Sequence, residues 1–179
     1  PTYFRSIGLG LEERVVEDLK KSGIVLGTES NPAPIFLQSF ELGALKRLSK
    51  LTSIRLIFLL DAPSALPFDN VRDGSHATYQ DLMSEESLSG LQSYVYGLGP
   101  AKNWIIPPGD INAEPTKFVA LAHKMGFKVH PYTFRSDKEN LPPEYNGDPT
   151  KEYLRFFRAG VDGLFSDFQE HAVKARKKF

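Results

Sequence analysis

The segment Ile54–Leu60 constrains the fold more than any other part of this sequence. It reads Ile-Arg-Leu-Ile-Phe-Leu-Leu, an apolar run far shorter than the roughly 20 residues that a membrane helix needs. An apolar run of this length is typical of a strand that is covered on both faces, and such strands occur in parallel sheets flanked by helices. The sequence therefore predicts an α/β fold.

Helical and strand-like segments alternate on both sides of this run. Apolar residues at helical spacing predict helices over 11–21, 40–48, 116–125 and 150–159, near Glu85 and from 166–167 onward. Short apolar segments predict further strands over 34–40, 93–98, 127–134 and 161–165. Ser84 and Asp148 are expected to cap helices, the second with a proline in the first turn.

One helix followed by about five strand–helix units predicts a parallel sheet. The units are spaced like the roughly 30 residues of each unit in an eight-stranded barrel. Because five strands do not close such a barrel, two architectures stay open. One is the last five units of a TIM (β/α)8 barrel, and the other is a small open doubly wound sheet. Periodicity alone slightly favours the open sheet, since a complete fold is the default expectation.

Composition excludes several classes of protein. The 179 residues hold 22 Lys and Arg against 22 Asp and Glu, so nothing indicates nucleic-acid binding or a polybasic membrane arm. Cysteine is absent, which rules out disulfides, zinc–thiolate sites and thiol nucleophiles. No signal-peptide pattern opens the chain, and its start at Pro1 predicts a cut edge.

General catalytic signatures are missing as well. The sequence has no complete dinucleotide fingerprint, no P-loop, no His-Glu-x-x-His and no Gly-x-Ser-x-Gly. The histidines are scattered, without metal-ligand spacing. His123 is expected to be a structural or surface residue, and His130, within a predicted strand, receives no catalytic role.

More specific strings occur in a fixed order along the chain. They are Gln38-Ser39-Phe40, Gly97-Leu98-Gly99-Pro100, His130-Pro131-Tyr132-Thr133-Phe134-Arg135 and Gly160-Val161-Asp162-Gly163-Leu164-Phe165-Ser166-Asp167-Phe168. Together they closely resemble the C-terminal portion of glycerophosphodiester phosphodiesterases of the periplasmic and plant-like branch. The resemblance implies a TIM barrel that hydrolyses glycerophosphodiesters to glycerol 3-phosphate and an alcohol. It also implies a divalent cation, Ca²⁺ or Mg²⁺, with paired histidines as acid and base.

The chain departs from the family where this chemistry is expected. The family's first strand carries His-Arg-Gly, its second Glu-x-Asp followed by a histidine, and its third Glu-x-Lys, and none of these is present. In relatives the Glu-x-Lys runs directly into Pro-x-x-Phe, and this chain opens with Pro1-Thr2-Tyr3-Phe4. We therefore expect no catalytic or metal-binding residue here and place the cation ligands upstream of Pro1. Residues 1–179 would form the C-terminal part of a single barrel domain.

Loops after the strands form the active site of a TIM barrel. On the resemblance, this places candidate substrate-binding residues at Gln38, Ser39, Phe40, Lys102, Tyr132, Phe134 and Arg135. An aromatic ring would pack on glycerol, the arginine would hold a phosphate bidentately, and the lysine would add positive potential. The alternatives are strand-end capping for the first three residues, core packing for the aromatic rings of the seventh strand, a surface salt bridge for the arginine and a solvated surface position for the lysine.

The polar segment 61–84 is a further candidate, because loops of that length are commonly functional. We expect an insertion that overhangs the pocket as a substrate-selecting lid, with Phe68, His76 and Tyr79. Asp167 is expected to cap the final helix.

Three hypotheses about function follow. In the first, the parent protein is an enzyme, this chain alone is inactive, and its open sheet edges are covered by the missing barrel half or by another chain. In the second, a catalytically inactive family member serves as a structural or interaction subunit. The third is an independent open-sheet binding module. The compartment stays unknown, although the family's habit suggests the periplasm, secretion or a plant-like organelle.

Overall fold

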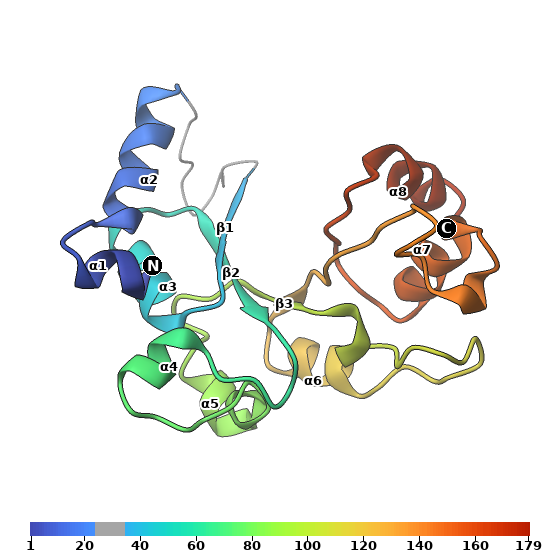
Figure 1. Cartoon of the computed structure of the whole chain (residues 1–179), viewed down its shortest axis with the longest axis horizontal. Coiled ribbons are helices and arrows are strands. Elements are labelled where there is room, and N and C mark those ends of the chain that lie inside the picture. Colours follow the sequence, from blue (N-terminus) through green and yellow to red (C-terminus); the bar gives the residue numbers. More distant parts are fainter. Residues whose placement is uncertain (24–34) are drawn as a thin grey trace. The chain divides into compact units, whose positions relative to one another are not determined.

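The computed structural model describes residues 1–23 and 35–179 (Figure 1). The chain forms two compact units, Pro1–Gly97 and Leu98–Phe179. None of the helices in the described residues is long and apolar enough to cross a membrane.

The first unit contains a parallel strand pair connected by a helix. Its strands are β1 (Phe36–Ser39) and β2 (Arg55–Leu60), and its helices are α1 (Thr2–Ser6), α2 (Leu11–Lys21), α3 (Leu42–Leu51), α4 (Phe68–Arg72) and α5 (Glu85–Ser89), with a 3-10 turn η1 (Asp81–Met83). Phe36 lies opposite Arg55 and Ser39 opposite Phe58 in the parallel register. The Tyr96 N–H donates to the Leu56 carbonyl at 2.9 Å, so the chain runs beside β2 as it enters β3.

Burial in the first unit follows the predicted patterns. Residues 56–60 of β2 are all buried, as expected of a strand covered on both faces. On α3, Ala44, Leu45 and Leu48 are buried at helical spacing, which directs one face of the helix into the core. The predicted strand over 34–40 is confirmed over Phe36–Ser39, while position 34 lies outside the described residues.

The second unit places three extended segments side by side. Its elements are β3 (Gly97–Pro100), which begins at the last residue of the first unit, η2 (Lys102–Trp104), α6 (Phe118–Lys124), β4 (Lys128–Val129), η3 (Pro143–Tyr145), α7 (Pro149–Arg158) and α8 (Gln169–Arg176). The His130 N–H donates to the Leu98 carbonyl, and the Asp162 N–H donates to the Val129 carbonyl, each at 2.9 Å. These bonds bring segment 161–166 to the other side of β4 from β3.

Several predicted strands are shorter than expected. The strand over 127–134 is regular only at Lys128–Val129 and then continues as single parallel bridges at Tyr132 and Phe134. Pro131 interrupts it because proline has no N–H to donate to the ladder. The strand predicted over 161–165 is wrong, since none of these residues lies in a strand and the single parallel bridge forms one residue later, at Ser166.

Two other predicted segments are corrected. The strand predicted over 93–98 begins only at Gly97, because the Tyr94 and Val95 N–H groups both bond the Leu91 carbonyl in a turn. Segment 61–84 is not irregular throughout, since it contains α4 and η1.

The predicted helix caps have two outcomes. The Ser84 hydroxyl accepts the Ser87 N–H at 3.1 Å, and the Asp148 carboxylate accepts the Thr150 N–H at 2.9 Å, as expected. Asp167 does not cap α8, whose N-cap residue is Phe168. The Asp167 carboxylate instead lies 3.5 Å from Nη1 of Arg135.

The Asp148 cap yields a stability prediction. Replacing Asp148 with Ala leaves the Thr150 N–H without its acceptor, so we expect the free energy of unfolding to fall by about 1 kcal/mol. Urea denaturation measures this loss. Lys151→Ala, an exposed position on the same helix, is the control, and an equal loss in both variants would contradict the capping role.

Candidate functional site

The carboxyl ends of β3 and β4 meet in the second unit. Ala101 forms a parallel bridge with Tyr132, and the Lys102 N–H donates to the Tyr132 carbonyl at 2.9 Å. Phe134 forms the next bridge, with Ser166. The structure therefore brings the candidates from the two strands to one end of this unit, where parallel strands of an α/β barrel carry their functional loops.

Lys102 is neither a solvated surface lysine nor an uncompensated charge. Its Nζ lies 2.6 Å from Oε1 of Glu152, and the two side chains are 20% and 2% exposed. The same Nζ lies 5.1 Å from the centroid of the Phe134 ring, within the range of a cation–π contact. The lysine is thus held by its backbone, by a carboxylate and by an aromatic ring.

Glu152 is the functional candidate that sequence reasoning missed. Burial raises its pKa and the charge of Glu144 adds to that shift, while Lys102 opposes both. Its second oxygen, Oε2, is buried and has no hydrogen-bond partner within the described residues. The available signal was its place one turn before Phe156, on the buried face of α7.

The lysine and the glutamate line a cavity of about 420 Å³. Two loops, which follow β3 and the β4 region, form most of its wall. Its lining comprises Ala101, Lys102, Asn103, Ile106, Pro107, Pro108, Tyr132, Thr133, Asn140, Pro142, Glu144, Tyr145, Glu152 and Phe156. Of the candidates in this unit, Lys102 and Tyr132 therefore line the cavity.

The other two candidates of this unit have different surroundings. Phe134 is fully buried and its ring stacks on that of Tyr153 at 5.3 Å, which matches the core-packing alternative. Arg135 lies on the surface, with Nε 2.9 Å from Oδ1 of Asp137 and a longer ion pair to Asp167, which matches the salt-bridge alternative. Hydrogen bonds from Asn140 and then from Arg135 lower the pKa of Asp137.

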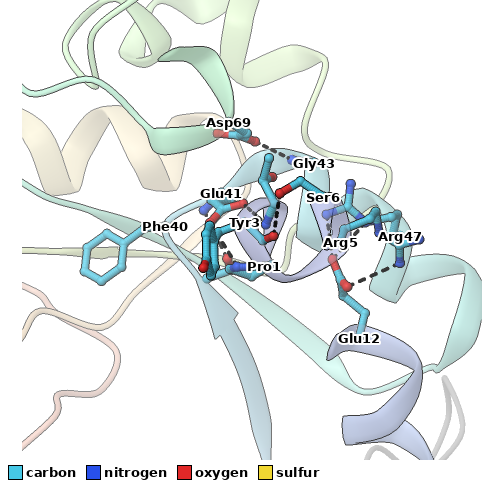
Figure 2. Close-up of polar contacts among 12 residues, drawn as sticks. Pro1, Tyr3, Arg5, Ser6, Glu12, Phe40, Glu41, Gly43, Arg47 and Asp69 are labelled. Atoms are coloured by element: carbon cyan, nitrogen blue, oxygen red, sulfur yellow. Dashed lines mark hydrogen bonds and ion pairs between the residues drawn. The ribbon is translucent and has the colours of Figure 1, made fainter. Parts of the chain in front are cut away.

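The candidates of the first unit lie at the end of β1, and Figure 2 shows one of them, Phe40. Ser39 is buried and its hydroxyl accepts the Glu41 N–H at 3.0 Å, which is the capping alternative. Gln38 is exposed. The Phe40 ring is 39% exposed, and Figure 2 shows it pointing away from the polar contacts around Glu41.

Segment 61–84 is attached to this strand end by two contacts. The Tyr79 hydroxyl donates to the Phe40 carbonyl at 3.1 Å, and the Asp69 carboxylate accepts the Gly43 N–H at 2.8 Å (Figure 2). Burial raises the pKa of Asp69, and the nearby Glu41 carboxylate adds to the shift. Tyr79 is buried, so of the three residues expected in a lid it packs inward, whereas Phe68 and His76 are exposed.

A buried carboxylate joins the helices of the first unit. Glu12 on α2 is 2% exposed, and its Oε1 accepts from Nε of Arg47 on α3 at 2.8 Å. Its Oε2 accepts from Nη2 of Arg5 at 3.3 Å (Figure 2). Because both arginines are compensated in this way, the cluster orders the helices and offers no isolated positive charge to a ligand.

A divalent cation does not fit the side chains described here. Within residues 1–23 and 35–179, no three His, Asp or Glu side chains converge on a point where a metal ion would be held. The buried carboxylates already have partners in the chain: Glu152 forms an ion pair with Lys102, and Asp69 accepts a hydrogen bond from the Gly43 N–H. We therefore derive no catalytic step through a cation from these residues.

Comparison with known proteins adds the family context. Residues 7–171 match the model of the glycerophosphoryl diester phosphodiesterase family. The chain is 37% identical over 166 residues to glycerophosphodiester phosphodiesterase GDPD6 of Arabidopsis thaliana, covering 90% of this chain and 43% of the relative. It is 30% identical over 151 residues to GDPDL7 of the same plant, covering 82% of this chain and 18% of the relative.

Solved structures agree on the fold. A crystal structure assigned to a glycerophosphoryl diester phosphodiesterase of Silicibacter pomeroyi matches with a TM-score of 0.58 at 16% identity, over 94% of this chain and 44% of that one. Another, from Agrobacterium tumefaciens, matches with a TM-score of 0.54 at 11% identity, over 92% of this chain and 49% of that one. The predicted TIM-barrel class is thereby confirmed, and the chain spans less than half the length of each of these relatives.

Proposed function

The chain belongs to the glycerophosphodiester phosphodiesterase family, and from that membership we propose that the natural full-length product hydrolyses glycerophosphodiesters. Water adds to phosphorus, the phosphorus–oxygen bond to the alcohol breaks, and the alcohol leaves with a proton, which yields glycerol 3-phosphate. The observation that carries the proposal is the family match over residues 7–171. The cavity that Lys102 and Tyr132 line at the ends of adjacent parallel strands supports it.

In this proposal residues 1–179 contribute substrate contacts. The rest of the barrel contributes the catalytic acid, the catalytic base and the cation ligands. The sequence motifs for those groups are absent from this chain, and no described side chains would hold a cation. Lys102 and Tyr132 would contact substrate from the cavity, and Arg135 from the surface. Gln38, Ser39 and Phe40 would form the corresponding strand end in the first unit.

Segment 61–84 is proposed to select among substrates as a lid. Its anchors at Tyr79 and Asp69 fix it to the end of β1 and the start of α3. The exposed Phe68 ring, 44% accessible, is the apolar side chain that such a lid would offer.

The proposal predicts an activity that requires more than this chain. We expect the full-length product to release glycerol 3-phosphate from glycerophosphocholine when Ca²⁺ or Mg²⁺ is added, and residues 1–179 alone to release none. An enzyme-coupled assay for glycerol 3-phosphate, with EDTA as the metal-free control, measures both. Cation-dependent hydrolysis by residues 1–179 alone would overturn the assignment of the catalytic groups to the rest of the barrel.

A second candidate function is favoured by the missing motifs. A family member without them would serve as a structural or interaction subunit whose sheet edges are covered by another chain. The same assay separates the two, because a full-length product that is inactive with either cation but co-purifies with a partner supports the subunit.

A further inference from the structure

The loop over residues 105–117, which connects η2 to α6, is closed by hydrogen bonds at its base. The Thr116 N–H donates to the Ile105 carbonyl at 2.8 Å, and the Thr116 hydroxyl donates to the Trp104 carbonyl at 2.6 Å. These bonds hold the two ends of the loop together. They do not fix the position of its tip, residues 109–113, which depends on contacts with other segments.

Arg155 on α7 reaches the tip with one end of its guanidinium. Its Nη2 donates to the Asp110 carbonyl at 3.1 Å and to the Ala113 carbonyl at 2.5 Å. Its Nη1 donates to the hydroxyl of Tyr145, in η3, at 3.3 Å. Because the donors of a guanidinium are fixed in one plane, this side chain orients the tip and η3 relative to each other. Within residues 1–23 and 35–179 no carboxylate forms an ion pair with Arg155, so its role is not that of a salt bridge.

Glu144 in η3 holds the same tip at a second point. Its Oε1 accepts the Gly109 N–H at 3.0 Å. Gly109 has a φ of +95°, a conformation that favours glycine because it has no Cβ. The tip is therefore held by two side chains, and we call Arg155 and Glu144 the loop clamp.

The segments that the loop clamp joins form opposite parts of the wall of the 420 Å³ cavity. Pro107 and Pro108 line it from the 105–117 loop, and Pro142 and Glu144 line it from the segment around η3. Arg155 itself does not line the cavity, so it acts on the cavity only through these segments. The loop clamp thus fixes the spacing of the two parts of the wall before any ligand enters.

We propose that Arg155 is a positioning residue that, together with Glu144, holds the 105–117 loop in the conformation that binds substrate. The inference rests on the proposed function, since the cavity is taken to receive part of the glycerophosphodiester. A loop that is ordered in advance loses less conformational entropy when substrate binds, so the loop clamp lowers KM. The acid, the base and the cation ligands are assigned to the rest of the barrel, so kcat should depend little on Arg155.

The test follows the loop and the reaction separately in the full-length product. Arg155→Met keeps a long side chain and removes its donors. We expect amide hydrogen exchange in residues 109–113 to accelerate about tenfold, and exchange in residues 116–124 to stay unchanged because the base is still bonded. KM for glycerophosphocholine should rise about tenfold, with kcat within about twofold. Arg158→Met removes an exposed arginine from the same helix and should change neither readout.

Conservative variants separate positioning from the loss of a charge. Arg155→Lys keeps the charge, but one ammonium does not reproduce the fork of donors, so exchange and KM should lie between those of Arg155→Met and the unchanged protein. Glu144→Gln keeps an oxygen acceptor for the Gly109 N–H and should preserve slow exchange in the tip, whereas Glu144→Ala should accelerate it. If Arg155→Met fails to fold, this pair of Glu144 variants decides whether the loop clamp exists.

Failure of this inference is distinguishable from failure of the proposed function. Unchanged exchange of the tip in Arg155→Met would show that the loop clamp is wrong, whether or not the protein hydrolyses glycerophosphodiesters. Faster exchange without a rise in KM, or with a fall in kcat alone, would overturn the positioning role. If the unchanged full-length product hydrolyses no glycerophosphodiester but the tip exchanges faster in Arg155→Met, the proposed function fails and the loop clamp stands.

Discussion

Replacing Phe134 with Ala is expected to lower the free energy of unfolding of the second unit by about 4 kcal/mol. The ring is fully buried, stacks on Tyr153 at 5.3 Å and meets Phe156 edge-on at 4.9 Å. Its removal therefore leaves a cavity between β4 and α7 that these large neighbours fill only in part. Urea denaturation followed by circular dichroism measures the loss.

Phe179 is the matched control for this experiment. It is 68% exposed, and its ring centroid lies 5.7 Å from that of Phe157 on α7. Phe179→Ala should cost less than about 1 kcal/mol, since little surface is buried. A loss for Phe134→Ala no larger than this would show that the ring at 134 is not a core residue and would return it to the substrate-binding candidates.

Replacing Lys102 with Met is expected to cost about 3 kcal/mol at neutral pH, because it leaves the Glu152 carboxylate buried without its cation. The pKa of Glu152, already raised by burial, rises further when the lysine is lost. A carboxyl with a raised pKa in the folded state penalises folding above that pKa. As the pH falls through it toward the ordinary value of 4.5, the penalty is relieved.

The measurement is urea denaturation of Lys102→Met and of the unchanged chain at several pH values from neutral to mildly acidic. The stability gap between them should narrow as the pH is lowered. The double variant Lys102→Met/Glu152→Leu removes both charges and should recover most of the loss at neutral pH. A double variant as unstable as the single one, or a gap independent of pH, would contradict a buried ion pair.

Local features of the fold were predictable because their causes lie close together in sequence. The run at 54–60 has enough apolar surface for a strand covered on both faces, and residues 56–60 are buried accordingly. Ser84 and Asp148 act as caps because each side-chain oxygen reaches an N–H two or three residues ahead. The strand over 127–134 was predicted too long, because the apolar pattern takes no account of the hydrogen bond that Pro131, which has no N–H, cannot donate to the sheet.

The candidate site was only partly predictable. The quoted strings indicated the strand ends, and the structure does bring Lys102 and Tyr132 together at one cavity. Their partner Glu152 was missed, because a glutamate in the first turn of a helix is ordinarily exposed to solvent and stabilised by the helix dipole. Only the packing of α7 shows that Glu152 is buried.

The sequence by itself determined the alternation of strands and helices, their main caps and, through its specific strings, the family. The tertiary structure decided which distant polar groups meet. Lys102 pairs with Glu152 across 50 positions of the chain, and the Tyr79 hydroxyl donates to the Phe40 carbonyl across 39. Periodicity and capping depend on neighbours within a few residues, so they can be read along the chain. The state of a buried charge depends on which distant side chain lies within about 3 Å of it, and that distance exists only once the segments have packed.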